Sequence, residues 1–255
     1  MSKPKVGIYG LTSCAGDQLA ILNLEDELLD LAGAVDIIDF PMAMSGNDPK
    51  TRLDVAFVEG SVVNSHDREF LQKIRERASL LVAIGTCAVW GGVPAMSNEI
   101  PREELKQKVY GEGGKAFDSI PAQPLSSFVK VDCSIPGCPM EKGHFLRAVA
   151  SLLHGDIPLL PTYAVCTECK MKENVCLLKE KDQLCLGPVT VAGCEALCPS
   201  HSVPCQGCRG PLEEANIASE VHLFREKGYS AEDIQKRLRT FAAPAAAIKS
   251  FFGKE

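Results

Sequence analysis

Eight of the twelve cysteines in this 255-residue chain lie close together near its C-terminal third. They are Cys166, Cys169, Cys176, Cys185, Cys194, Cys198, Cys205 and Cys208. The first two and the last two form C-x2-C pairs. Thiols in such a pattern serve three kinds of chemistry: disulfide frameworks, structural zinc sites and iron–sulfur clusters.

Disulfides are the weakest of these interpretations. They need an oxidising compartment and are typical of short secreted domains. Residues 1–10 show neither a charged and apolar export signal nor a twin arginine. No stretch approaches the ~20 consecutive apolar residues of a membrane helix. We therefore expect a cytoplasmic protein, without membrane association, whose thiols stay reduced and bind metals.

Zinc is a serious alternative, because two C-x2-C pairs and further cysteines can build four-thiolate zinc sites. Three features favour iron–sulfur clusters. Eight thiolates are what two all-cysteine clusters require. Cys194, Cys198 and Pro199 resemble the C-x3-C-P ending of a bacterial ferredoxin motif. The intervening residues 186–193 are mostly small and apolar, which lets backbone N–H groups approach cluster sulfurs in a dry pocket. The sequence thus favours two 4Fe–4S clusters here.

The residues before this stretch alternate between strand-like and helix-like patterns. Strands are expected at 6–10, 35–40, 55–58, 80–84 and 128–131, and helices from residue 17, at 66–78 and at 141–153. Such alternation predicts an α/β fold, a flavodoxin-like doubly wound parallel sheet. Ligands of these sheets bind beyond the carboxyl ends of the strands. Cys14, Glu59, Cys87 and Cys138 all fall there, with Asp17 and Cys133 nearby.

Two simpler interpretations of this sheet edge are weaker. A lone cysteine is usually a small buried hydrophobe, but several share this edge. Thr12-Ser13 opens the first loop as a phosphate-binding loop would, but the glycine-rich fingerprint of nucleotide sites is missing.

Composition divides the chain into three expected parts: a flavodoxin-like domain at 1–160, a small cysteine-rich iron–sulfur domain at 161–211, and C-terminal helices at 212–255. Ser230 is a helix start signal in the last part. A net charge of −6 argues against nucleic-acid binding.

Several motifs together resemble nickel–iron hydrogenase small subunits. The proximal-cluster motifs are Leu11–Gln18 (LTSCAGDQ), Val58–Ser61 (VEGS), Gly85–Ala88 (GTCA) and Gly137–Pro139 (GCP). Cys185–Pro199 and Cys205–Pro211 resemble the two-cluster region of the cytoplasmic, bidirectional branch. Sulfhydrogenase delta subunits, which work with NADP(H), are the most similar subgroup, and methanogen relatives that reduce a deazaflavin or viologen dyes are the alternative. The likeness covers nearly the whole chain.

The resemblance implies three 4Fe–4S clusters. Cys14, Cys87 and Cys138 would hold the proximal cluster, nearest the partner's nickel–iron centre. The family's usual motif there is C-x2-C, and Asp17 replaces its second cysteine. A carboxylate can bind iron, so Asp17 is the expected fourth ligand, with Cys133 as the alternative. In the simplest division of the other eight, Cys166, Cys169, Cys176 and Cys185 hold the second cluster and Cys194, Cys198, Cys205 and Cys208 the third, although ferredoxin-like crossing also fits.

The resemblance implies an electron-transfer subunit of a nickel–iron hydrogenase, with hydrogen chemistry in the large subunit. The chain lacks the paired C-x2-C motifs near both termini that bind nickel in large subunits, and it has no G-x-G-x-x-G fingerprint. Flavin and NADP are therefore expected on flavin/NAD(P)-binding and ferredoxin-like partner subunits. The alternatives are a complex I-like cluster-carrying subunit and a zinc-stabilised assembly protein without redox activity.

Overall fold

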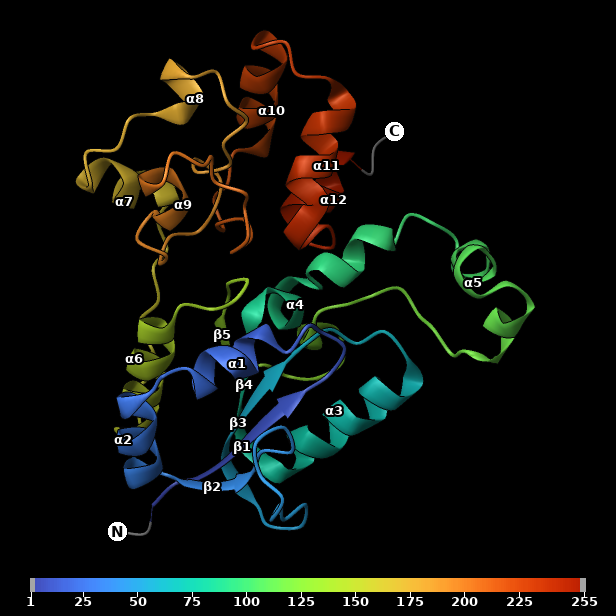
Figure 1. Cartoon of the computed structure of the whole chain (residues 1–255), viewed down its shortest axis with the longest axis vertical. Coiled ribbons are helices and arrows are strands. Elements are labelled where there is room, and N and C mark those ends of the chain that lie inside the picture. Colours follow the sequence, from blue (N-terminus) through green and yellow to red (C-terminus); the bar gives the residue numbers. More distant parts are fainter. Residues whose placement is uncertain (1–2, 253–255) are drawn as a thin grey trace. The chain divides into compact units, whose positions relative to one another are not determined.

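The computed structural model describes residues 3–252 and divides into two compact units, with the boundary between Pro158 and Leu159. The first unit contains a five-stranded sheet with helices on both faces (Figure 1). Its strands are β1 (Lys5–Gly10), β2 (Asp36–Asp39), β3 (Leu53–Glu59), β4 (Ala78–Ile84) and β5 (Cys133–Ile135). Its α-helices are α1 (Gly16–Leu22), α2 (Asp26–Ala34), α3 (Ser65–Arg77), α4 (Gly85–Trp90), α5 (Arg102–Tyr110) and α6 (Lys142–Leu153). Short 3-10 helices lie at Val93–Ser97, Gly111–Ala116 and Leu125–Ser127.

The sheet has the order β2-β1-β3-β4-β5, and every pairing is parallel. This is the flavodoxin-like order, and it confirms the expected fold class. Side chains of a strand alternate between the two faces, so each strand supplies two layers of core. On one face Val58 and Leu81 pack with Leu71 of α3. On the other, the rings of Phe57 and Phe145 of α6 lie 5.0 Å apart, edge to face.

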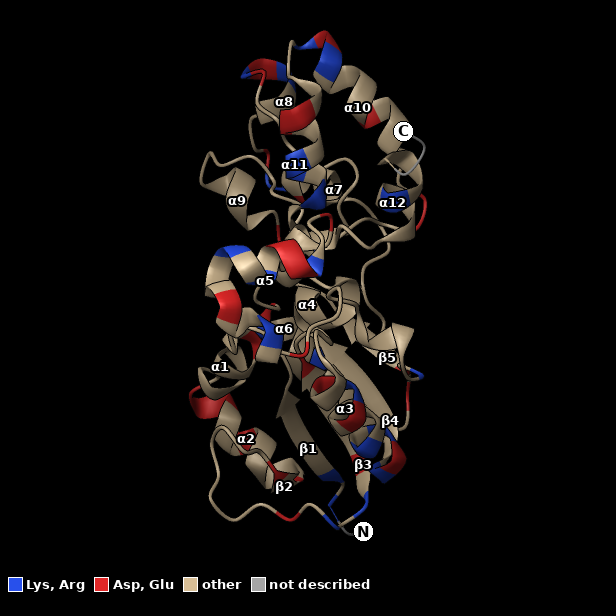
Figure 2. Ribbon diagram, turned by 90° about the vertical axis from the view of Figure 1, so that its right-hand side faces the viewer, with Lys and Arg blue, Asp and Glu red and all other residues tan. Residues whose placement is uncertain are grey.

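The helices of this unit start and end where local signals place them. Asn64 caps α3 by accepting a hydrogen bond from Asp67 N, and Glu141 caps α6 by accepting one from His144 N. Charged residues of both signs are distributed along α3 (Figure 2), whose apolar residues face the sheet. The carboxyl ends of β1, β3, β4 and β5 therefore form one edge with a covered core behind it.

Two sequence expectations for this unit were wrong. The strand expected at 128–131 is irregular, and the fifth strand is Cys133–Ile135. Asp132 fixes that register, because its N–H donates to Leu81 O and its carboxylate accepts from Leu81 N. The single helix expected from residue 17 is two helices, α1 and α2, interrupted around Glu25, whose φ of 56° no α-helix contains.

The second unit has little regular structure around its cysteines. Three short helices, α7 (Val165–Met171), α8 (Leu177–Glu180) and α9 (Leu197–Ser200), are joined by turns and isolated bridges. They are followed by α10 (Ile217–Glu226), α11 (Ala231–Ala242) and α12 (Ala246–Phe252). Ser230 Oγ accepts the N–H of Asp233, as the expected start signal requires. The first of the helices expected within 212–255 begins at Ile217, where Asn216 caps it.

Candidate metal centres

At the sheet edge of the first unit, Cys14 lies in the loop after β1, Cys87 in the first turns of α4 after β4, and Cys138 in the loop after β5. The thiols of Cys14 and Cys138 belong to exposed residues, whereas Cys87 is half-buried. Burial raises the pKa of the Cys87 thiol to about 12, and the nearby Cys138, Asp17 and Cys14 add to this shift. The fold thus brings these four sequence-predicted residues close enough to interact electrostatically.

Glu59, the last residue of β3, fixes the loop that carries Cys14. Its side chain is fully buried and accepts hydrogen bonds from Ser13 Oγ at 2.7 Å and from Gln18 N at 2.9 Å. A buried carboxylate with two donors is well satisfied. The interaction with Gln18 N also places negative charge at the N-terminal turn of α1, which the helix dipole favours. Glu59 therefore holds both sides of Cys14 against the sheet.

Asp17 is buried, with 6% of its surface exposed. Its Oδ1 accepts a hydrogen bond of 2.6 Å from Met140 N, two residues beyond Cys138. Burial raises the pKa of this carboxyl to about 7, the Met140 hydrogen bond opposes the shift, and the charge of Glu59 adds to it. Gly85 makes room for the carboxylate: at its φ of 78°, an added Cβ would lie 1.8 Å from Asp17 Oδ2. Asp17 is thus held between the segments that carry Cys87 and Cys138.

Cys133 lies apart from this group along its strand. It is the first residue of β5 and pairs with Val82, whereas Ile135 pairs with Ile84 at the edge. Two residues of strand place its Cα about 6–7 Å back from the edge. Burial raises the pKa of its thiol, and the charged neighbour that adds to this is Asp132.

In the second unit, Cys166, Cys169, Cys176 and Cys185 line one pocket of about 280 Å³. We call it the thiol pocket. Its other walls are mainly apolar, including Val165, Leu177 and Leu178, together with Gly187 and Pro188. Burial raises the pKa of the Cys166 thiol to about 12, and the other three thiols add to it in the order Cys185, Cys169 and Cys176. These four residues are the set that the sequence assigned to one cluster.

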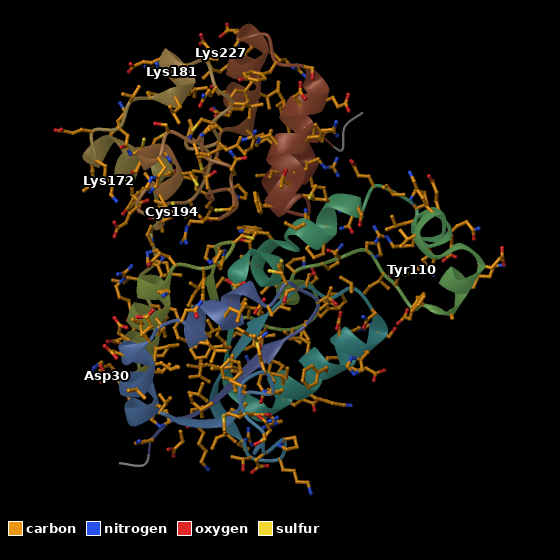
Figure 3. All side chains as sticks on the ribbon, viewed as in Figure 1. Asp30, Tyr110, Lys172, Lys181, Cys194 and Lys227 are labelled. Carbon is orange, nitrogen blue, oxygen red and sulfur yellow. The ribbon has the colours of Figure 1, made fainter. Side chains whose placement is uncertain are left out.

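Cys194 lies just before α9 (Figure 3), Cys198 lies within α9, and Cys205 and Cys208 lie in the turns that follow it. Burial raises the pKa of Cys205, and the Cys185 and Cys208 thiols add to it. Burial also raises the pKa of Cys194, whose charged neighbours are Glu168 and Arg209.

Cys185 is a junction between the two sets of four. It lines the thiol pocket, and its Sγ also accepts a hydrogen bond of 3.2 Å from Cys205 N. Leu186 N donates in turn to Cys205 O at 3.0 Å. Because Cys185 and Cys205 lie this close together, a crossed division of the eight cysteines between two clusters remains compatible with the structure, as does the sequential division.

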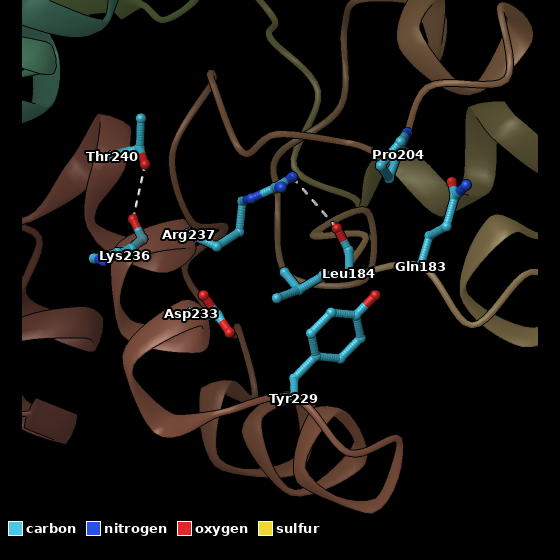
Figure 4. Close-up of a pocket in the computed structure, with 8 residues that line it drawn as sticks. All are labelled: Gln183, Leu184, Pro204, Tyr229, Asp233, Lys236, Arg237 and Thr240. Atoms are coloured by element: carbon cyan, nitrogen blue, oxygen red, sulfur yellow. Dashed lines mark hydrogen bonds between the residues drawn. The ribbon is translucent and has the colours of Figure 1, made fainter.

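A second pocket, of about 400 Å³, opens beside Leu184 and Pro204, the chain neighbours of Cys185 and Cys205 (Figure 4). Arg237 donates a hydrogen bond to Leu184 O, and Thr240 donates one to Lys236 O. No cysteine of the described chain lines this pocket, and its charges are mixed. It is therefore a separate surface feature and not part of the thiol sets.

The donors at both sites suit iron–sulfur clusters. Clustered thiols with raised pKa values are protonated and neutral without a metal, and coordination to a cation deprotonates them. The thiol pocket also has the close backbone approach that a cluster needs: a Cβ added to Gly187 would lie 3.1 Å from Cys166 Sγ and 3.6 Å from Cys185 Sγ. Within residues 3–252, no three His, Cys, Asp or Glu side chains lie close enough to share one metal ion.

Comparisons with known proteins give the chain its family. The sequence model for NADH ubiquinone oxidoreductase, 20 Kd subunit, matches residues 14–152. The chain is 39% identical to sulfhydrogenase 2 subunit delta of Pyrococcus furiosus, over 93% of this chain and 99% of the relative. The chain belongs to the nickel–iron hydrogenase small-subunit family. It is also 35% identical to a subunit of the F420-non-reducing hydrogenase vhu of Methanocaldococcus jannaschii, with 96% of each chain covered.

A solved structure supports the same membership. A chain of an NAD+-reducing [NiFe]-hydrogenase, in its H2-reduced state, superposes with a TM-score of 0.55 and 28% identity. The match covers 62% of this hydrogenase small subunit and 96% of that chain. Across residues 3–252, no helix has both the length and the apolar character needed to cross a membrane.

Some residues of the candidate sites were not predicted from the sequence. Glu220 of α10 is buried, and its charge acts on the Cys166 and Cys185 thiols. Lys170, Lys179 and Lys227 line the thiol pocket. The density of lysines between 170 and 181 is visible in the sequence, whereas nothing in the local sequence links Glu220 to cysteines more than thirty positions away.

Proposed function

We propose that this chain is the electron-transfer subunit of a cytoplasmic nickel–iron hydrogenase and carries three 4Fe–4S clusters. The clusters supply one-electron redox centres between the nickel–iron site of the large subunit and a downstream module. The observation that carries the proposal is the grouping of the thiols: Cys14, Cys87 and Cys138 interact at one sheet edge, and four more line a single apolar pocket.

The proposed ligands follow these groups. The proximal cluster has Cys14, Asp17, Cys87 and Cys138, with Cys133 as the alternative fourth ligand. For the other two clusters we propose the sequential sets. The second set is Cys166, Cys169, Cys176 and Cys185. The third set is Cys194, Cys198, Cys205 and Cys208. The position of Asp17 between the segments of Cys87 and Cys138 supports it over Cys133.

We propose that the three sequence-defined parts have separate roles. Residues 1–160 present the proximal cluster to the large subunit. Residues 161–211 provide the eight other cysteines, and residues 212–255 the helices that pack against them. The downstream module would be a flavin/NAD(P)-binding subunit with a ferredoxin-like subunit, and NADP the nicotinamide. One similar solved structure, an NAD+-reducing [NiFe]-hydrogenase, supports a nicotinamide-linked partner.

Anaerobic purification with metal and sulfide analysis tests the proposal. Three cubane clusters require about twelve iron atoms per chain and a matching amount of acid-labile sulfide. Reduced samples should show interacting cluster signals by EPR, and a large hydrogenase subunit should co-purify. Zinc without sulfide would support the non-redox assembly protein, and about four irons would support a complex I-like subunit with a single cluster.

A further inference from the structure

Glu168 connects the two sets of four cysteines. It lies in α7, within the first C-x2-C pair, yet its carboxylate binds the backbone on both sides of Cys194. Oε1 accepts a hydrogen bond of 2.8 Å from Gly193 N, and Oε2 accepts one of 3.2 Å from Ala196 N. Hydrogen bonds to an ionised carboxylate are stronger than those between neutral groups. Glu168 therefore holds the turn that presents the Cys194 thiol.

The turn after Cys194 directs backbone N–H groups at its sulfur. Glu195 and Ala196 have φ angles of 52° and 51°, in the left-handed region that non-glycine residues seldom adopt. In this conformation the N–H groups of Ala196 and Leu197 donate hydrogen bonds to the Cys194 sulfur. Hydrogen bonds to the sulfurs are one of the factors that set the reduction potential of a cluster. By holding the turn, Glu168 also holds these donors in place.

Arg209 brings a positive charge to the same thiol. It follows the last cysteine of the chain, and only 2% of its surface is exposed. Its Nε donates a hydrogen bond of 2.9 Å to Ala192 O, two residues before Cys194. The backbones of the two segments are joined as well, because Val191 N donates to Gly210 O at 3.1 Å. A guanidinium group keeps its proton in proteins, so this buried charge is permanent.

The two charges act on Cys194 in opposite directions. Burial raises the pKa of its thiol, the charge of Glu168 adds to this rise, and the charge of Arg209 opposes it. The same signs hold for an added electron, since a 4Fe–4S cluster with its thiolates is an anion whose negative charge grows on reduction. Charges that are buried or partly buried act at a low effective dielectric constant and are screened little by salt.

From this geometry we propose that Glu168 and Arg209 are opposing charges that set the midpoint potential of the cluster bound by Cys194. Arg209 stabilises the reduced cluster and raises the potential, whereas Glu168 lowers it and fixes the turn around the sulfur. Both are positioning residues, and neither is an iron ligand. The inference rests on the proposed function, because it names residues that tune one of the proposed clusters.

Redox titration followed by EPR, on the anaerobically purified complex, tests this assignment. Cys194→Ala first identifies the cluster signal that depends on Cys194. Arg209→Met and Glu168→Gln then remove one charge each with little change in side-chain size. We expect Arg209→Met to lower the midpoint of that cluster and Glu168→Gln to raise it, each by about tenfold in the reduction equilibrium, or about 59 mV for one electron. The double variant should return close to the wild-type midpoint.

Matched variants separate charge from structure. Arg209→Lys keeps the charge and should keep the midpoint near that of the wild type. Glu195→Gln changes a carboxylate next to Cys194 that is 78% exposed and paired with Lys172, so the midpoint should hardly move. Added salt should not remove the shift of Arg209→Met, because the charge is buried. Midpoints that move in the same direction in Arg209→Met and Glu168→Gln, or that do not move, would overturn the inference.

Glu168→Gln keeps the test decisive if Arg209→Met does not fold, because Glu168 is only half-buried. Iron and sulfide analysis of the same samples distinguishes this inference from the proposed function. Intact clusters with unchanged midpoints would overturn the assignment of the two charges and leave the proposed function standing. Wild-type protein without iron and sulfide would overturn both.

Discussion

The two cysteine-bearing regions use their thiols in opposite ways. At the sheet edge, Cys14 and Cys138 are exposed and lie on loops outside a core that the strands and α3 and α6 complete without them. In the second unit, Cys185 and Cys205 are buried members of the hydrophobic core itself. The first is a site added to a stable fold, whereas the second is a fold organised around its site.

Backbone strain is concentrated in the second unit, the one whose core contains cysteines. Seven non-glycine residues between positions 3 and 252 have a positive φ. Two of them lie in the first unit, and the other five are Glu173, Asp182, Glu195, Ala196 and Ser202. Each costs roughly 1 kcal/mol or more in the left-handed region. Such conformations persist only where the surroundings impose them. The turns between the cysteines therefore need strong constraints, and metal coordination is of that strength.

The largest expected effect is the response to cluster removal. Oxidative destruction of the clusters with a chelator should unfold the second unit, because it would lose a metal-binding energy comparable to the ~10–16 kcal/mol known for structural zinc sites. The first unit should stay folded, because its core is complete without its cysteines. Limited proteolysis with mass spectrometry should then give a resistant fragment that ends near Pro158, where Ile157 and Leu159 are 81% and 97% exposed. A second unit that stays resistant after complete iron loss would show that its fold does not depend on the clusters.

Single cysteine variants sharpen the same comparison. Cys14→Ala and Cys185→Ala should each lower the iron content by about four atoms per chain. Only Cys185→Ala should also lower the thermal stability of its unit, because it opens a cavity in the core and releases Cys205 N. Iron analysis with circular dichroism melting measures both effects. Equal loss of stability in the two variants would contradict the distinction between an added site and an organising one.

The contrast also explains what the sequence predicted and what it did not. Continuous apolar runs such as Leu80–Ile84 identify buried parallel strands, so the sheet and its functional edge were predictable. Phe128–Val131 is also largely apolar, apart from Lys130. It follows a 3-10 turn and packs only partly onto the core, and Asp132 fixes the register of the strand that comes next. Contacts between residues far apart in the sequence, such as Gly85 and Asp17, leave no local sequence pattern. Within the cysteine segment, the simplest sequential division groups four thiols that do line one pocket, but the Cys185–Cys205 contact depends on the tertiary fold.

Asp17 tests the sheet-edge site with a smaller effect. Asp17→Cys should keep the proximal cluster and shift its midpoint potential, because thiolate is a softer donor to iron than carboxylate. Redox titration followed by EPR measures the shift, with Asp26→Asn, in the first turn of α2, as a control that should change nothing. Unchanged titration and EPR spectra for Asp17→Cys would remove Asp17 from the ligands and return Cys133 to consideration.

The smallest effect concerns Glu220, a buried charge beside the organising site. Its Oε1 has no hydrogen-bond partner in the described structure, and burial raises the pKa of this carboxyl to about 7. Its negative charge disfavours adding an electron to a nearby cluster, so Glu220→Gln should raise that cluster's midpoint potential by tens of millivolts.

The pH dependence of the cluster's midpoint potential provides a second test of the direction of the Glu220 effect. Below its pKa Glu220 is neutral, and above it the carboxylate is charged, so the wild-type midpoint should fall as the pH rises through about 7. Glu220→Gln should remove this slope. Glu226→Gln changes an exposed carboxylate of the same helix that faces His222, and it should leave the slope intact. Redox titrations at several pH values measure all three proteins, and equal slopes in the wild type and Glu220→Gln would assign the pH dependence to another group.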